Sequence, residues 1–138
     1  MATVPRRTET VLRPTEGELA ILRVLWEQGP ISVREVQRIM NASRPTGYTT
    51  VLKLMQIMTE KGLLERDEAE RAHVYKPRVA REKTQRAIVG HMLDRVFSGS
   101  AADLMMQALA AKPTSPAEIN EMREMLARYE KEQKQGGK

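Results

Sequence analysis

The spacing of apolar residues between positions 51 and 58 constrains the fold of this chain most strongly. Val51, Leu54, Met55 and Met58 recur at i, i+3, i+4 and i+7. This period predicts a helix with one apolar stripe, and such a stripe must face a core. The opposite stripe is polar and consists of Thr46, Thr49, Thr50, Lys53 and Gln56. Short hydroxyls beside longer Lys and Gln side chains suit the major groove of DNA, but a solvated helix has a similar face.

Two further helices are predicted before this segment. Thr15-Glu16-Gly17-Glu18 has the pattern of a capping box, in which the end side chains bind free amides at a helix start, and Gly29-Pro30 ends that helix. Its apolar residues are Leu19, Leu22, Leu25 and Trp26. Ser32-Val33-Arg34-Glu35 is a second box, and Asn41 is the expected cap at the end of the helix it opens. Residues 42–45 then form the turn into the third helix, which we expect to run from Thr46 to Glu60.

A short β-hairpin is predicted after Gly62, because the apolar period changes there from 3.6 towards 2. Residues 63–66 and 72–76 are the expected strands, an acidic turn over residues 67–71 joins them, and Pro77 ends the second strand. The turn lacks a tight-turn signature, so a longer loop is the alternative. Three helices followed by a hairpin is the order of a winged helix-turn-helix.

The remainder of the chain is predicted to be helical again. Its apolar faces are too broad for a segment below about 70 residues to bury alone, so a second copy of the chain is expected to cover them. Packing onto the first domain is the alternative. Ser115-Pro116-Ala117-Glu118 has the pattern of a start for the last helix. The residues expected at the dimer interface are Met92, Val96, Leu104, Met105, Leu109, Ile119, Met122 and Leu126.

The expected fold is therefore mainly α with a small β-hairpin. Residues 14–77 form an N-terminal winged helix-turn-helix, and residues 78–132 form a C-terminal three-helix dimerisation domain. Residues 1–13 are a flexible N-terminal arm, and residues 133–138 are a disordered tail.

The charge of the chain is concentrated in two regions. The 138 residues carry a net charge of +5. Residues 31–61 and 78–98 each contain five basic and two acidic residues, whereas residues 62–77 contain three basic and four acidic ones. This distribution favours a polyanionic partner, with a solvated basic surface as the alternative.

Several classes of function are disfavoured by the composition. The chain has no cysteine, which excludes disulfides, thiolate metal sites and cysteine nucleophiles. His73 and His91 have no third ligand at a regular spacing, so we expect no metal and no cofactor. There is no Gly-x-Ser-x-Gly elbow and no Gly-rich phosphate loop, so we do not expect an enzyme. No apolar run reaches the ~18 residues of a membrane span, and no secretory signal is present, so we expect a cytoplasmic protein without a membrane partner.

The DNA-binding residues are expected around the third helix. Arg44 lies before its start, where a phosphate is also favoured by the helix dipole. Lys53 is long enough to reach either a phosphate or a guanine, and Gln56 and Arg71 are weaker candidates. The full set is Arg44, Thr46, Tyr48, Thr49, Thr50, Lys53, Gln56 and Arg71.

Four stretches of sequence are similar to the penicillinase-repressor family. They are Thr15–Leu22 with Leu25-Trp26, Gly47-Tyr48-Thr49-Thr50-Val51-Leu52, Glu60–Arg66 and Ala72–Pro77, and the resemblance runs from about Pro14 to Tyr129. It implies a homodimeric repressor with a winged helix, a helical dimerisation domain and a palindromic operator in double-stranded DNA. In the family the recognition helix contacts bases and phosphates, and here these contacts would fall on Thr46, Tyr48, Thr49, Thr50 and Lys53.

The chain departs from the family pattern at two places. Members that a sensor protease inactivates are cut near an Asn-Phe pair in the second C-terminal helix. The corresponding stretch here, Met106-Gln107-Ala108-Leu109, lacks that pair. Its absence argues against a proteolytic switch, so a sensor protease is a doubtful partner. Copper-responsive members carry a C-terminal cysteine cluster, which is absent here.

The sequence thus predicts a sequence-specific transcriptional repressor that binds a palindromic operator as a homodimer. A ligand-sensing winged-helix regulator with a small-molecule pocket is one alternative. A winged helix used for protein contact is another.

Overall fold

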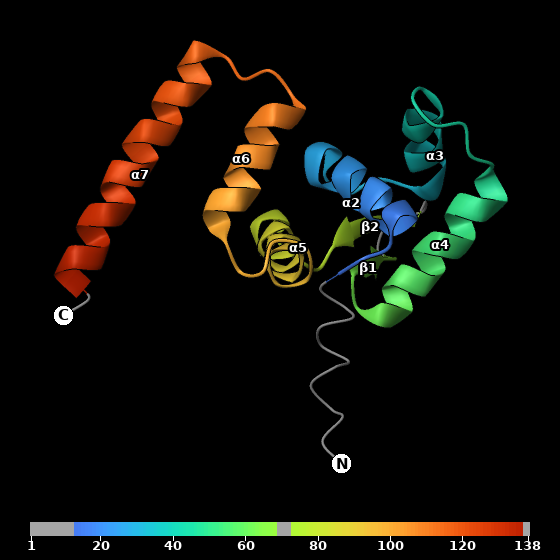
Figure 1. Cartoon of the computed structure of the whole chain (residues 1–138). Helices are drawn as coiled ribbons and strands as arrows, with labels where there is room; N and C mark the ends of the chain where they lie inside the picture. The colour runs from blue at the N-terminus through green and yellow to red at the C-terminus, as the bar shows by residue number, and fades with distance from the viewer. Residues whose placement is uncertain (1–12, 69–72, 137–138) are drawn as a thin grey trace. The chain divides into compact units, whose positions relative to one another are not determined.

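The structure is a computed structural model that describes residues 13–68 and 73–136 (Figure 1). Its elements are α2 (Glu16–Gln28), α3 (Val33–Asn41), α4 (Tyr48–Lys61), β1 (Leu64–Asp67), β2 (Val74–Pro77), α5 (Arg81–Arg95), α6 (Ala101–Ala111) and α7 (Pro116–Gly136). The predicted fold class, mainly α with a small hairpin, is confirmed. The predicted N-terminal arm lies outside the described residues except for Arg13.

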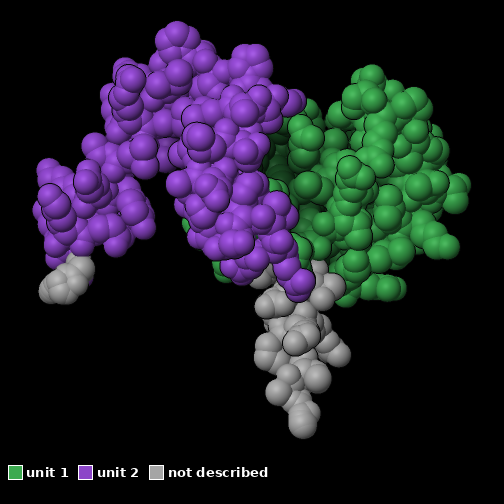
Figure 2. All heavy atoms as spheres, viewed as in Figure 1, with its two compact units in different colours: residues 1–92 green, residues 93–138 purple. Residues whose placement is uncertain are grey.

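The chain forms two compact units, residues 1–92 and residues 93–138 (Figure 2). The division falls within α5, so most of this helix belongs to unit 1. The sequence-based limits, 14–77 and 78–132, place the change earlier and stay a prediction.

Helix α2 begins at the predicted capping box. The Thr15 amide donates to Glu18 Oε1 at 2.9 Å, and the Glu18 amide donates to Thr15 Oγ1 at 3.2 Å. Both halves of the box are therefore formed, which stabilises the helix start. The Glu18 carboxylate is buried and also accepts a hydrogen bond from Lys61 Nζ at 2.7 Å. This ion pair joins the start of α2 to the end of α4.

Only half of the second predicted box is formed at the start of α3. The Ser32 hydroxyl accepts from the Glu35 amide at 3.2 Å. The Glu35 carboxylate binds Arg38 instead, through hydrogen bonds of 2.9 and 2.8 Å from Nε and Nη2. Asn41 is the last residue of α3, but its side chain does not bind the helix end. Its Oδ1 accepts from the Thr46 amide at 3.0 Å, which fixes the turn before α4.

The core of unit 1 lies between α2, α3, α4 and the hairpin. Its buried apolar residues are Ile21, Leu22, Leu25, Val33, Val36, Met40, Val51, Met55, Met58, Leu63, Leu64 and Tyr75. Ile21 is fully buried although it was not part of the predicted stripe. The reason is that α2 contacts α3, α4 and β2, so a wider arc of this helix is covered.

The predicted hairpin is confirmed, with shifted limits. Strands β1 and β2 pair antiparallel from Leu64 opposite Pro77 to Asp67 opposite Val74. Pro77 ends the second strand as expected, but the first strand begins one residue later than predicted. A bridge from Ile31 to Tyr75 extends the pairing through hydrogen bonds of 3.3 and 2.8 Å, and the sequence did not predict this third segment.

The first turns of α5 are fixed to α2 through the single tryptophan. Trp26 Nε1 donates to the Val79 carbonyl at 3.0 Å. The Arg81 guanidinium lies over the Trp26 ring, 5.8 Å from its centroid. Thr84, one turn further along α5, is completely buried. These contacts explain why α5 begins as part of the unit that contains α2.

Unit 2 consists of the end of α5 and helices α6 and α7. The break between α5 and α6 includes Ser98 and Gly99, which have φ values of 50° and 81°. Ser100 and Ser115 cap α6 and α7, each accepting from an amide at 3.1 Å. Helix α7 continues to Gly136 and thus includes residues 133–136, for which the sequence analysis expected a disordered tail. No residue of α6 or α7 is buried.

Candidate nucleic-acid interface

Helix α4 has the two faces that its sequence predicts. Val51, Met55 and Met58 are completely buried. Tyr48, Thr49, Thr50, Lys53 and Gln56 are exposed. Gly47 precedes the helix without a side-chain cap, and Gly62 ends it in the left-handed conformation that glycine favours. The packing of α4 thus leaves a largely polar face in solvent, which also includes the exposed side chain of Ile57. The role of this face in DNA binding stays a prediction.

Thr46 does not lie on this helix, contrary to the prediction. Helix α4 begins at Tyr48, and Thr46 belongs to the preceding turn. Its hydroxyl donates to the Arg44 carbonyl at 2.9 Å, and its own carbonyl accepts from Gln37 Nε2 at 3.1 Å. These bonds occupy the polar groups of Thr46 in holding the turn. The Arg44 side chain remains exposed beside the helix start, as expected.

A groove of about 510 Å³ lies between α4, the start of α3 and the hairpin. Its polar lining includes Arg34, Tyr48, Gln56, Arg66 and His73. The structure therefore brings two predicted residues, Tyr48 and Gln56, together with two arginines that the sequence analysis did not single out. Positive charge beside exposed amide and hydroxyl groups is the chemistry that binds a sugar-phosphate backbone.

The arginines of α3 and β1 differ in their partners. Arg38 forms a bidentate pair with Glu35, and its hydrogen bonds lower the pKa of that carboxyl. Arg66 pairs with Glu68, and hydrogen bonds to Glu68 and Tyr75 raise the pKa of Arg66. The Arg34 guanidinium instead lies over the Tyr48 ring, 5.1 Å from its centroid. No sequence period relates Arg34 to Tyr48, so only the fold reveals this contact.

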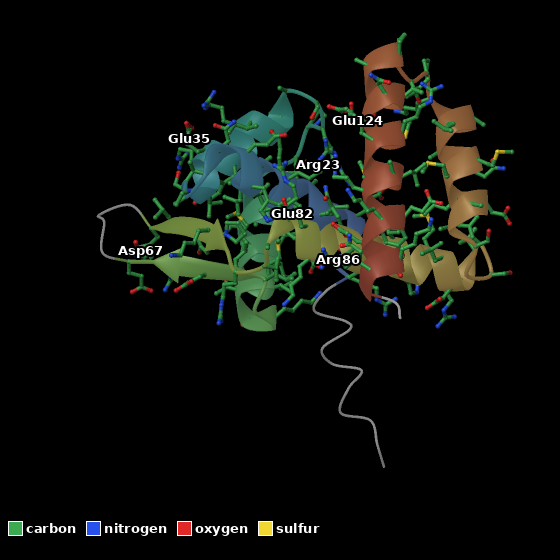
Figure 3. The ribbon with its side chains drawn as sticks, turned by 90° about the vertical axis from the view of Figure 1, so that its left-hand side faces the viewer. Arg23, Glu35, Asp67, Glu82, Arg86 and Glu124 are labelled. Atoms are coloured by element: carbon green, nitrogen blue, oxygen red, sulfur yellow. The ribbon has the colours of Figure 1, made fainter. Side chains whose placement is uncertain are left out.

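The hairpin contributes fewer predicted contacts. Arg71, one of the predicted contacts, lies outside the described residues. His73 is exposed at the groove, and Asp67 lies at the outer end of β1 (Figure 3). Within residues 13–68 and 73–136, no group of three or more His, Asp or Glu side chains is placed to hold a metal ion.

The predicted dimer-interface residues lie on α5, α6 and α7 and the segment between α5 and α6. Met92, Leu104 and Met122 are half-buried. The others are exposed: Val96, Met105, Leu109, Ile119 and Leu126. Met105, Leu109 and Met122 line one hollow of about 300 Å³ between α6 and α7. Unit 2 therefore presents apolar side chains that its own helices do not cover.

The described helices do not include one that is both long and apolar enough to cross a membrane.

Comparison with known proteins gives consistent matches along the chain. The family model described as "Penicillinase repressor" matches residues 14–128. A "Penicillinase repressor" from Bacillus licheniformis is 22% identical over 121 residues, which cover 88% of this chain and 94% of the relative. A "Transcriptional regulator BlaI" from Mycobacterium tuberculosis is 28% identical over 116 residues, 82% of either chain.

Among solved structures, one match is the solution structure of the Bacillus licheniformis BlaI monomeric form in complex with the blaP half-operator. It has a TM-score of 0.48 and 20% identity, and it covers 54% of this chain and 90% of that chain. The family match itself spans nearly all the described residues, from before α2 into α7. The chain therefore belongs to the penicillinase repressor family.

Proposed function

We propose that this chain is a transcriptional repressor that occupies a palindromic operator as a homodimer, with α4 of each copy as the recognition helix. The observation that carries the proposal is the division of α4 into a buried stripe and a polar face. Three of its apolar residues are completely buried, whereas Thr49, Lys53 and Gln56 are exposed. A recognition helix needs such anchoring, because its base-reading side chains must be held at a fixed angle.

The surroundings of α4 support contact with a duplex. Arg44 is exposed near the start of the helix, and the groove beside the hairpin is lined by Arg34 and Arg66. Phosphate contacts from such residues supply affinity, while residues on the helix select the sequence. The relatives named a penicillinase repressor and a transcriptional regulator fit this role. Genomic duplex DNA as the partner implies that the protein acts in the cytoplasm.

The homodimer is proposed because of the uncovered apolar residues of unit 2. Leu109, Ile119 and Leu126 are exposed although each lies on an amphipathic helix. Pairing with a second copy removes this apolar area from water. Two copies related by a dyad present two α4 helices, which matches a palindrome with half-sites about one helical turn apart.

Selection of bound sequences from a random duplex pool tests the proposal. We expect a palindromic consensus, with binding that weakens steeply as salt concentration rises. An enriched single half-site without a repeat would contradict the homodimer. The absence of any enrichment would contradict sequence-specific repression and favour a winged helix used for protein contact.

A further inference from the structure

Arg34 and Tyr48 form a contact between two helices at the edge of the proposed interface. Arg34 is in the first turn of α3, and Tyr48 is the first residue of α4. The guanidinium carbon lies 5.1 Å from the centre of the Tyr48 ring, and both side chains are exposed and line the groove beside the hairpin. At this distance the ring attracts the cation and restricts its orientation.

We propose that Arg34 binds a DNA phosphate at this groove and that Tyr48 is the positioning residue that holds its guanidinium in place. The inference rests on the proposed function and names a contact that extends the interface from α4 to α3. It also changes the expected role of Tyr48. A ring that supports an arginine acts through that arginine, rather than by reading a base itself.

The lack of a carboxylate partner distinguishes Arg34 from Arg38 and Arg66. Arg38 gives its hydrogen bonds to Glu35, and Arg66 pairs with Glu68. In the parts of the chain that the structure describes, no carboxylate pairs with Arg34. The N–H groups of a guanidinium lie in its own plane, so a ring stacked on its face does not occupy them. They can still donate two parallel hydrogen bonds to a phosphate.

The position of Arg34 within α3 also indicates a role other than helix stability. Helix N-termini carry partial positive charge, so a cation in the first turn is unfavourable. Glu35, at the next position, has the sign that this end of the helix favours. Replacing Arg34 by alanine is therefore expected to weaken DNA binding without lowering the melting temperature. A purely structural arginine would show the opposite pattern.

The test compares Arg34→Ala with the wild-type full chain on the duplex that the wild type selects. Kd is measured over a range of salt concentrations. We expect Kd to rise about tenfold and the slope of log K against log salt to fall by about one unit, as for the loss of one phosphate contact. The melting temperature is expected to stay the same or to rise.

Arg86→Ala is the matched control, because it removes the same charge from another exposed position of unit 1. Figure 3 shows Arg86 on α5, away from the side of the unit where Glu35 of α3 lies. We expect this variant to keep the wild-type salt slope. An equal fall in slope for both variants would overturn the proposal, because it would indicate a general effect of net charge.

Two substitutions of Tyr48 test its positioning role. Tyr48→Phe keeps the ring and is expected to retain the wild-type salt slope, whereas Tyr48→Leu is expected to lose most of what Arg34→Ala loses. The double variant with Arg34→Ala and Tyr48→Leu should then be little weaker than either single variant, because the two residues act as one unit. Additive losses would overturn the role of Tyr48.

The outcomes separate this inference from the function on which it rests. Wild-type binding together with an unchanged Kd and slope for Arg34→Ala would overturn the phosphate contact alone. Absence of salt-dependent duplex binding by the wild type would overturn the proposed function itself, and with it this contact.

Discussion

Thr84 is a polar residue of unit 1 whose burial lowers the stability of the fold. Thr84 on α5 is completely buried, and no described protein atom hydrogen bonds with its Oγ1. A buried hydroxyl without a partner loses its hydration and gains nothing in return. The sequence did not predict this burial, because Thr84 is polar and lies on no predicted apolar stripe.

Thr84→Val is expected to stabilise the chain. Valine has nearly the same shape and a similar helix propensity, so the change removes the hydroxyl without opening a cavity. We expect the free energy of unfolding to rise by about 1 kcal/mol, measured by urea denaturation. Thr84→Ala also removes the hydroxyl but loses a methyl group, so it should be less stable than Thr84→Val. A less stable Thr84→Val would mean that the hydroxyl has a hydrogen-bond partner.

An ion pair links the ends of two helices of unit 1. Lys61 at the end of α4 binds Glu18 at the start of α2, and the exposed fractions of their side chains are 34% and 3%. Glu18 also accepts a hydrogen bond from the Thr15 amide within the capping box. One carboxylate therefore serves both the start of a helix and the contact between two helices.

Lys61→Met is expected to destabilise unit 1, because it leaves the Glu18 carboxylate buried without its cation. Loss of one partner from a fully buried pair costs about 3–5 kcal/mol, and solvent at Lys61 reduces the expected loss to about 1–2 kcal/mol. Chemical denaturation measures the change. Adding Glu18→Gln to Lys61→Met removes the buried charge while keeping an oxygen for the Thr15 amide, so it should restore part of the stability. No recovery would indicate that packing of the lysine stem, not charge, causes the loss.

The elements that could be predicted from the sequence are those fixed by short-range patterns. Each predicted helix start depends on residues only three positions apart. The capping box of Thr15 and Glu18 and the cap of α7 at Ser115 both form as expected. The Ile31 bridge to Tyr75 joins residues that are far apart in the sequence, so no local pattern announces it. The contact of Arg34 with Tyr48 was missed for the same reason. Thr46 is a different case, because nearby groups, the Asn41 side chain and the Arg44 carbonyl, hold it in the turn before α4.

The two units differ in how far each encloses its apolar residues. Unit 1 has a buried core, whereas α6 and α7 have no buried residue. Leu126 and Tyr129 on α7 have exposed fractions of 57% and 61%. The sequence indicated this difference, because it showed three amphipathic helices without a partner face.

Leu126→Glu is expected to convert the proposed homodimer to a monomer, because a carboxylate at the apolar contact proposed between the two copies must lose its hydration. Light scattering after size-exclusion chromatography measures the mass of the complex. Asn120→Glu adds the same charge at an exposed position on another face of α7, and it should remain dimeric. A dimer that persists in Leu126→Glu would exclude this face of α7 as the contact.

The intrinsic fluorescence of Trp26 reports on its contact with the start of α5. Trp26 is the single tryptophan, and its indole N–H binds the Val79 carbonyl while Arg81 covers its ring. Intrinsic fluorescence at tryptophan wavelengths therefore comes from one site, where α5 meets α2. A shift of emission to longer wavelength would report that α5 has separated from α2, without any attached dye.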